Sequence, residues 1–307
     1  MHTSPGAIVF SEWLRRQGYK VVQTGSSYWF TEAHGVYQAF PHHWLICPDQ
    51  GELSELYYRH HARALRYSSP EDVSNGDPSY HVVCQTTNFD FASVNSSTRR
   101  NVRDGLKKCL VERISFDRLL GEGWPISCET EKRQGRNLGI TYNEWAHSNK
   151  SAADLDGFEV WGALVGGILA AFIVSFQMDE CCYMLYQRSL DRYLSHHVNH
   201  ALSFSWMKTM LSRSGITSLF NGMQPLDAPG TVDSFKFRLG YEPKPIRQCV
   251  QLHPWLAPFS RPIHGSLRIA KLLWPHSPTL SKAEGLTRIH IASKGALRLR
   301  ETAVNSN

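Results

Sequence analysis

The chain has 307 residues, of which 42% are hydrophobic and 20% are charged, and this excludes an intrinsically disordered protein. Its net charge of +6 favours anionic partners without indicating nucleic acid. The seven cysteines include no C-x-x-C pair, and the N-terminus lacks the layout of a signal peptide. We therefore expect the protein to lie in the reducing cytoplasm and to have no disulfide framework.

The first 150 residues are predicted to form a mixed α/β unit. A short helix over residues 8–17 precedes three strand-like segments, of which the last two are SYWFTE and GVYQAF. Apolar residues at helical spacing predict a second helix over residues 52–65. After a polar loop, YHVVCQTT is predicted to be a strand.

A basic helix is predicted from Ser96 or Ser97, either of which can cap it, to about Leu110. Its predicted buried stripe consists of Val102, Leu106, Cys109 and Leu110. The basic residues beside this stripe can bind an anion or simply face water. No helix-turn-helix, zinc-ligand spacing or stacking motif accompanies them, so we expect no sequence-specific nucleic-acid partner. ERISFDRLL is predicted to lead into a further helical region, and another helix is predicted around residues 140–148.

The segment 160–176 contains no charged residue, which leaves two interpretations open. A membrane helix is one of them, although the run is at the lower limit of a spanning length and both flanks are acidic. The other is a β-hairpin, because Gly166–Gly167 is typical of a two-residue turn between strands. We expect the hairpin, followed by the strand CCYMLYQRS, a helix over 196–213 and the strand ITSLFNG.

Simple alternation along CCYMLYQRS predicts which side chains share a face. One face would hold Tyr183, Leu185 and Gln187, and the other would hold Met184, Tyr186 and Arg188. The preceding Cys181 and Cys182 are expected to be small buried apolar residues. His196 and His200 lie four apart with no H-E-x-x-H pattern, so we expect no metal site, and a general-base role for a histidine here stays open.

The last segment, residues 253–307, is basic and interrupted by prolines. Residues 261–300 carry eight Lys or Arg residues among leucine, isoleucine and tryptophan residues. One interpretation is a peripheral contact with an anionic membrane surface. The apolar anchors would then be Leu267, Ile269, Leu272, Leu273 and Trp274. The other interpretation is a helix packed on the domain, followed by a frayed terminus.

The order of hairpin, central strand, helix, a strand ending in FNG and the helix SFKFRLGY resembles the C-terminal half of FemAB-like acyltransferases of the GNAT superfamily. The segment 235–241 resembles their F-K-x-x-x-G-[FY] motif through Phe235, Lys236, Gly240 and Tyr241. The segment SVNSSTRRNVRDGLKKC is similar to a Ser- and Arg-rich helix of that branch, with the spacing S-x-x-R-x-x-x-R through Ser96, Arg99 and Arg103. The resemblance covers about half of the chain.

This resemblance implies an α/β (α+β) fold of tandem GNAT-like halves, with mixed, mostly antiparallel sheets flanked by helices. The first half would span residues 1–150, and the second half, residues 151–252, would carry the cleft. Residues 253–307 would form the basic tail.

The resemblance also implies an N-acyltransferase that moves an acetyl or aminoacyl group to an amine acceptor, either a small molecule or a lipid-linked one. The donor would be acyl-CoA or aminoacyl-tRNA, with no tightly bound cofactor. From Gln187 the chain lacks the Q/R-x-x-G-x-G/A pattern that cradles a pyrophosphate in many GNAT enzymes. The alternative is a non-catalytic module that binds an anionic ligand or a membrane. The implied location is the cytoplasm, or the inner membrane face if the tail attaches there.

The candidate catalytic residues are Tyr183, Tyr186 and Asn221. The candidate donor- or acceptor-binding residues are Gln187, Arg188, Lys236, Arg238, Arg99, Arg103 and Lys107. Each tyrosine has an alternative role as a packed aromatic residue, and the basic residues have an alternative role as a solvated helix face.

Overall fold

The computed structural model describes residues 4–33, 35–86, 88–135, 139–224, 233–274 and 277–304. Its core is one sheet, in which eleven described strands follow the order β1-β2-β3-β4-β11-β5-β10-β9-β8-β7-β6. In chain order the strands are β1 (Val21–Gln23), β2 (Tyr28–Ala33), β3 (Val36–Phe40), β4 (Ala64–Ser69), β5 (Asp77–Cys84), β6 (Leu110–Ile114), β7 (Phe158–Val165), β8 (Ile168–Met178), β9 (Cys181–Ser189), β10 (Ser218–Met223) and β11 (Glu242–Leu252).

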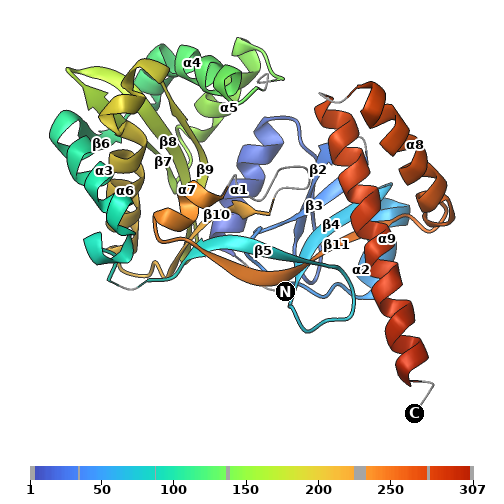
Figure 1. Cartoon of the computed structure of the whole chain (residues 1–307). Coiled ribbons are helices and arrows are strands. Elements are labelled where there is room, and N and C mark those ends of the chain that lie inside the picture. Colours follow the sequence, from blue (N-terminus) through green and yellow to red (C-terminus); the bar gives the residue numbers. More distant parts are fainter. Residues whose placement is uncertain are drawn as a thin grey trace.

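The sheet is mixed and mostly antiparallel, as predicted, and the two halves share it. Among its described pairings, only β3–β4 and β9–β10 are parallel, one in each half. The halves exchange strands, because β11 lies between β4 and β5 while β5 pairs with β10. Figure 1 shows two lobes joined by the long β5 and β11. The domain boundaries at residues 150 and 252 stay a prediction, and β6 already belongs with the second lobe through its pairing with β7.

Helices cover both faces of this sheet. They are α1 (Pro5–Arg16), α2 (Gln50–Ser54), α3 (Ser96–Lys108), α4 (Phe116–Arg133), α5 (Tyr142–Ala152), α6 (Val198–Leu211), α7 (Ser234–Arg238), α8 (Ser260–Leu273) and α9 (Pro278–Val304). In the second lobe, α6 and α3 form a buried cluster on one face, whereas α4 and α5 pack on the other. Helix α1 lies between the lobes and packs its buried Phe10 against Phe40 of one lobe and Phe176 of the other (Figure 1).

The charge-free segment 160–176 forms the predicted hairpin of β7 and β8. Val165 pairs with Ile168, so Gly166 and Gly167 are the whole turn, and both have positive φ, which glycine adopts without steric cost. No described helix has the length and apolar character that a membrane span needs.

Two predicted helices end earlier than expected. The helix predicted over 52–65 is α2 followed by a π-helical turn over Glu55–Arg59, and the chain is extended again from Ala64 because β4 pairs with β11. The basic helix α3 ends at Lys108, and Asn95, not Ser96 or Ser97, caps it by accepting a hydrogen bond from the Thr98 N–H.

The predicted buried stripe of α3 is therefore half wrong. Val102 and Cys109 are buried, but Leu106 is 39% exposed and Leu110 is 59% exposed. Gly105 is the residue that faces α6, where an added Cβ would lie 2.7 Å from the His197 carbonyl oxygen and 2.9 Å from the Ala201 Cβ. A residue without a side chain lets the two helices approach closely, and this shifts the contact face of α3.

The segment after β11 forms a helical hairpin of α8 and α9. Helix α9 packs on β11, where the Leu252 N–H lies 3.4 Å from Nδ1 of the buried His290. Helix α8 packs on α9 and is the outermost element on that side of the first lobe (Figure 1). The segment therefore covers the sheet through α9 and leaves α8 at the surface.

Candidate functional site

The candidate site lies where the parallel strands β9 and β10 separate. Only three residue pairs join them, ending at Tyr183 and Phe220, although both strands continue beyond that point. We call this place the strand separation. Beyond it, β9 runs through Met184–Ser189 and β10 through Asn221–Met223, so each strand has backbone groups that its parallel neighbour does not pair.

A bulge in β9 lies at the strand separation. In the pairing with β8, Met184 is opposite Ser175 and Tyr186 is opposite Val174, so Leu185 has no partner in register. Since β10 no longer pairs here either, neither neighbouring strand has a residue in register with Leu185. A bulge of this kind leaves backbone groups free and redirects the following side chains.

The bulge overturns the simple alternation predicted for β9. Gln187 lies on the α6 side with Met184, since its amide oxygen accepts from the Ser203 hydroxyl at 2.9 Å and its amide nitrogen donates to the Asn199 side chain at 3.1 Å. Tyr186 lies on the opposite side, where its hydroxyl donates to the side-chain oxygen of Asn149 in α5. The extra residue shifts the phase by one position, so Tyr183 and Tyr186 share a face.

The hydroxyl of Tyr183 connects the second lobe to the first. Tyr183 is 2% exposed, and its oxygen lies 2.6 Å from Nδ1 of His43 and accepts from the His43 backbone N–H at 3.2 Å. Burial raises the pKa of Tyr183 well above its ordinary value and lowers the pKa of His43. A neutral phenol and a neutral imidazole therefore form this contact.

The polar residues after Tyr186 are held on opposite faces. Arg188 forms an ion pair with Glu131 of α4 at 2.7 Å, and its guanidinium lies 5.5 Å from the centre of the Tyr186 ring. Burial raises the pKa of Tyr186 above its ordinary value. The Arg188 side chain is thus held at α4 and the Gln187 side chain at α6, although the Arg188 guanidinium also donates to the Gln187 backbone carbonyl oxygen at 3.1 Å.

A polar network lies at the β10 side of the strand separation. The Lys236 ammonium donates to the Asn221 carbonyl oxygen at 2.9 Å and forms an ion pair with Asp233 at 2.9 Å. Asp233 is 1% exposed and accepts from the Tyr80 hydroxyl at 3.1 Å. The Asn221 side chain reaches across to the Met184 sulfur at 3.6 Å, so β9, β10, β5 and α7 meet at these residues.

The F-K-x-x-x-G-Y motif has a physical basis at this network. Gly240 has a φ of +94°, and an added Cβ would lie 2.8 Å from the Ser93 carbonyl oxygen. The turn therefore needs glycine both for its conformation and for its close approach. The next residue, Tyr241, is buried beside Asn221, and burial raises its pKa well above the ordinary value.

The basic helix α3 adjoins α7. The Asn95 N–H donates to the Arg238 carbonyl oxygen at 3.3 Å, which joins the start of α3 to the end of α7. A groove of about 320 Å³ runs along α3 and is lined by Ser96, Arg99, Arg100, Arg103, Asp104 and Lys107. It contains the three predicted binding residues of this helix. Arg103 also lies over the Phe91 ring at 5.1 Å.

The first turn of α6 differs from a pyrophosphate-binding helix N-terminus. A single 3₁₀ segment, Asp191–His196, leads into α6 without glycine, and His197 at the N-cap has a φ of +55°. Helix α3 covers this turn through the Gly105 contact, and Asp104 lies 3.7 Å from the His197 ring nitrogen. Because a carboxylate already lies at this helix end, the geometry does not favour a pyrophosphate there.

In the first half, the corresponding place is the point where the parallel strands β3 and β4 stop pairing, and there a further backbone segment bonds to β4. Past the last β3–β4 pair, Gln38 with Arg66, the Ile46 N–H donates to the Ser68 carbonyl oxygen at 2.8 Å. The Ser69 hydroxyl donates to the Ile46 carbonyl oxygen at 2.7 Å. Within the part of the chain that the structure describes, no such backbone segment bonds to β9 beyond Tyr183. The second half therefore holds the candidate site.

The other residues named from the sequence have these positions. Cys181 and Cys182 are buried, as expected, and burial raises the pKa of each thiol to about 12. Burial lowers the pKa of His200 to about 4, and its ring lies 5.1 Å from Phe235 of α7. The described residues hold no group of three or more potential metal ligands.

Three residues of the site were not identified from the sequence, namely His43, Tyr80 and Asp233. His43 lies in the turn that follows β3, and nothing local indicates that it contacts β9. Tyr80 lies in a strand predicted as such, but its place beside α7 depends on the exchange of β5 between the halves. Asp233 precedes the F-K motif by only two residues, and this proximity was the one usable signal.

No protein-family model and no curated protein matches this chain. Solved structures do match it, among them FemX, with a TM-score of 0.56, 10% identity, and coverage of 81% of this chain and 92% of FemX. The C-terminal domain of a lysylphosphatidylglycerol synthetase from Agrobacterium fabrum matches with a TM-score of 0.55, 12% identity, and coverage of 82% of this chain and 89% of that domain. L-PGS from Bacillus licheniformis matches with a TM-score of 0.51, 12% identity, and coverage of 81% and 93%. The chain therefore shares its fold with FemX and with these two other structures, at a distance at which about one residue in ten is identical, and this agrees with the fold that the sequence resemblance implied.

Proposed function

We propose that the chain is an N-acyltransferase that uses the strand separation as its acyl-donor site. The observation that supports this most is the pairing of β9 with β10 over only three residues, with the unpaired Leu185 directly beyond. The fold shared with FemX and with the lysylphosphatidylglycerol synthetase domain supports the same class of reaction. The closed position at Ile46 in the first half supports a single donor site per chain.

The proposed reaction is attack of a neutral amine on the acyl carbonyl carbon. The C–N bond forms, the bond from that carbon to the sulfur or oxygen of the donor breaks, and the proton that the amine loses ends on the leaving thiol or hydroxyl. The carbonyl oxygen gains negative charge in the transition state, and a backbone N–H of the separated β9 edge next to Leu185 would donate to it. Lys236 would add a positive charge near the leaving group, since Asp233 and the Asn221 carbonyl oxygen hold its ammonium at the β10 side of the strand separation. In this proposal Tyr183 and Tyr186 position the strand, because their hydroxyls are engaged with His43 and Asn149.

The proposed donor carries phosphate groups that the α3 groove binds. Arg99, Arg103 and Lys107 line this groove, and α3 also covers the α6 turn at which many GNAT enzymes hold a pyrophosphate. Aminoacyl-tRNA and acyl-CoA both supply such phosphates. The acceptor is an amine on a small molecule or on a lipid-linked precursor.

The test is transfer of a radiolabelled acyl group by the purified chain. Acetyl-CoA and a mixture of charged tRNAs are supplied in parallel, with a panel of amines that includes aminoacyl and amino-sugar acceptors. We expect amide product with one donor class, and a loss of about a hundredfold or more in kcat for Lys236→Met, as for loss of one charge-stabilising donor. Lys208→Met, on the exposed side of α6, is the matched control and should retain activity. Binding of both donors with no product in any combination would contradict the enzymatic proposal.

A second candidate is a non-catalytic module that binds the same anionic ligand. The engagement of both candidate tyrosines in buried hydrogen bonds favours it, because no side chain of β9 is then left to move a proton. Donor binding in a thermal-shift titration, abolished by Arg99→Gln with Arg103→Gln but never followed by turnover, would support this candidate.

A further inference from the structure

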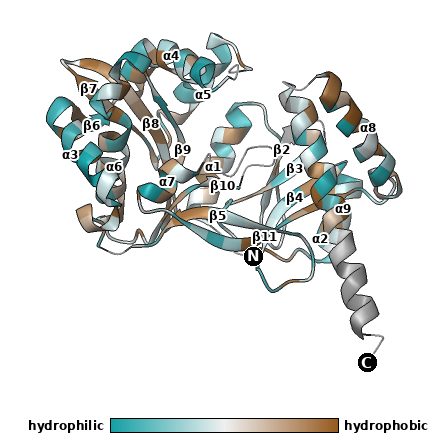
Figure 2. Ribbon diagram, in the orientation of Figure 1, coloured by the Kyte–Doolittle hydropathy of each residue, from teal (hydrophilic) through white to brown (hydrophobic). Residues whose placement is uncertain are grey.

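Helix α8 presents an apolar face that the rest of the described chain does not cover. Its inner side packs on α9, where His264 and Lys271 lie 3.7 Å from Glu284. On its outer side Ile269 is 63% exposed, Leu272 82% and Leu273 67%. Figure 2 shows brown, hydrophobic stretches on this outermost helix. Four large apolar groups exposed together, counting Trp274 at 61%, exceed the scattered apolar residues of an ordinary surface.

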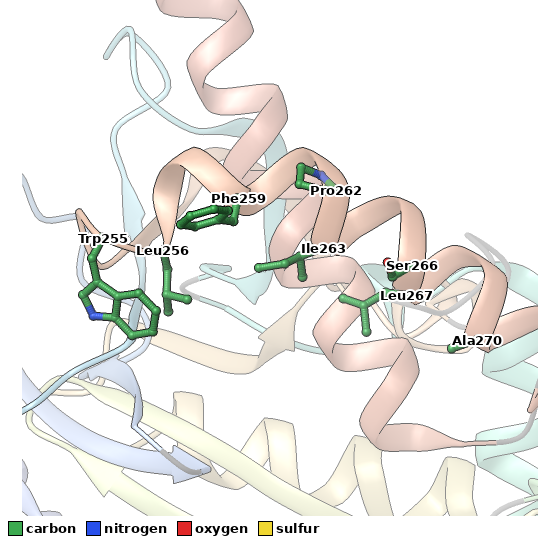
Figure 3. A pocket seen from close by; sticks show the side chains of 8 residues that line it. All are labelled: Trp255, Leu256, Phe259, Pro262, Ile263, Ser266, Leu267 and Ala270. Atoms are coloured by element: carbon green, nitrogen blue, oxygen red, sulfur yellow. The ribbon is translucent and has the colours of Figure 1, made fainter.

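The apolar surface continues past the start of α8. A groove of about 680 Å³ is lined by Trp255, Leu256, Phe259, Pro262, Ile263, Ser266, Leu267 and Ala270 (Figure 3). Ser266 is the one polar residue among them. Trp255 is 58% exposed and Phe259 is 56% exposed, so the helix has an exposed tryptophan near each end. Such aromatic side chains have an apolar body with a polar edge, which suits the boundary between lipid and water.

The charges beside this face are basic. In residues 253–293 the one carboxylate is Glu284, whose side chain is 13% exposed and lies within 4 Å of the basic groups of His264, Lys271 and Arg288. Arg261 and Arg268 are exposed on α8 itself. An apolar face bordered by free basic groups, with no exposed carboxylate in this segment, complements an anionic planar surface. It fits a protein partner less well, because a protein surface carries charges of both signs.

We propose that the outer face of α8 docks on an anionic lipid bilayer. The leucines and tryptophans enter the boundary of the headgroups and acyl chains, the groove at Phe259 accommodates acyl-chain carbons, and Arg261 and Arg268 contact the lipid phosphates. Helix α9 holds α8 away from the sheet, so docking requires no rearrangement of the catalytic lobe. This surface is separate from the strand separation, and the proposal does not depend on the acyl-transfer activity.

The test is sedimentation of the full chain with vesicles of phosphatidylcholine, with and without phosphatidylglycerol. We expect binding to the anionic vesicles and little binding to the neutral ones. Leu272→Glu with Leu273→Glu should lower the partition coefficient at least tenfold. Arg261→Gln with Arg268→Gln should lower it on anionic vesicles by on the order of thirtyfold at low salt, and added salt should reduce this difference. Ile8→Glu, on the exposed side of α1 at 52% exposure, is the matched control and should bind as the natural chain does.

Three outcomes would overturn the proposal. The first is equal sedimentation of the natural chain and the Leu272→Glu, Leu273→Glu variant. The second is equal binding to neutral and anionic vesicles, which would remove the role of the basic residues. The third is a lower melting temperature or a change from dimer to monomer in that variant, because either would mean that protein already covers the face in solution.

Discussion

At the scale of single residues, the contact between Tyr183 and His43 decides how the two lobes meet at the site. The phenol lies on the last β9 residue that β10 still pairs, and the histidine belongs to the segment that follows β3. The phenol is buried, the imidazole is 16% exposed, and both groups are neutral. A contact of this kind fixes the angle at which β9 leaves β10, without itself handling a proton.

Tyr183→Phe tests this positioning role. The substitution leaves the His43 N–H and ring nitrogen without their partner, which should lower the free energy of unfolding by about 1–3 kcal/mol. Chemical denaturation measures this, with Tyr58→Phe at a 62% exposed position as the control. We expect turnover to fall by less than about tenfold, since the phenol is not a proton donor in the proposed reaction. An unchanged stability with turnover abolished would instead make Tyr183 the catalytic acid.

His81 should make the protein sensitive to acid. Burial lowers its pKa to about 3, and its ring nitrogen lies 2.9 Å from the Ser68 hydroxyl. The folded chain keeps this imidazole neutral, whereas the unfolded chain protonates it below about pH 6.5. Acid therefore favours the unfolded state, and the free energy of unfolding should drop by about 2 kcal/mol from this group between about pH 7.5 and pH 5.

The contribution of His81 is measured by comparing the free energies of unfolding of His81→Gln and of the natural chain at pH 7.5 and at pH 5, which are about the two ends of this range. The glutamine can still bond to Ser68 but cannot titrate, so the variant should lose about 2 kcal/mol less than the natural chain over the same range. His61→Asn, at an exposed position, should keep the pH dependence of the natural chain. Parallel pH profiles for the natural chain and His81→Gln would show that the ring is not buried and neutral.

At the scale of elements, α3, which carries the basic groove, crosses closely over α6 at Gly105. Two opposing effects act at Gly105. An alanine there would favour the helix by about 1 kcal/mol, but its Cβ would lie 2.7 Å from a backbone oxygen that cannot move freely. Overpacking of this kind typically costs about 1–3 kcal/mol, so we expect the steric cost to exceed the gain in helix propensity.

Gly105→Ala should therefore lower the melting temperature, although alanine is the better helix former. Gly121→Ala is the matched control, because Gly121 lies inside α4 with no atom within 4 Å of the added Cβ. That variant should gain about 0.5–1 kcal/mol of stability. Equal gains at both positions would contradict the close approach of α3 to α6.

Local chemistry explains which elements could be predicted. The β7–β8 hairpin follows from Gly166–Gly167, whereas the F-K-x-x-x-G-Y segment was predicted from its resemblance to a family motif, and its glycine has the positive φ that such a turn needs. The bulge at Leu185 could not be predicted, because it depends on where β8 and β10 stop pairing with β9. The contact face of α3 could not be predicted either, because it depends on the packing of Gly105 against α6, which is distant in the sequence.

At the scale of the whole molecule, the exchange of β5 and β11 makes the two halves one unit. It carries Tyr80 from the first half to the network of Asp233 and Lys236, and it links α9 to both halves through β11. Periodicity along the chain predicted most of the strands but not this exchange, since pairing between distant strands leaves no local pattern. The polar network of the candidate site is for this reason only partly visible in the sequence.

The proposed donor site in the second half is tested most directly by hydrogen–deuterium exchange with and without saturating donor, acetyl-CoA or charged tRNA. We predict slower exchange of backbone amides in residues 184–189 of β9 and 221–223 of β10, together with the α3 groove. The closed counterpart around Gln38, Ile46 and Arg66 should not change. Donor-dependent protection at that first-half position, with exchange at the strand separation unaltered, would contradict the account.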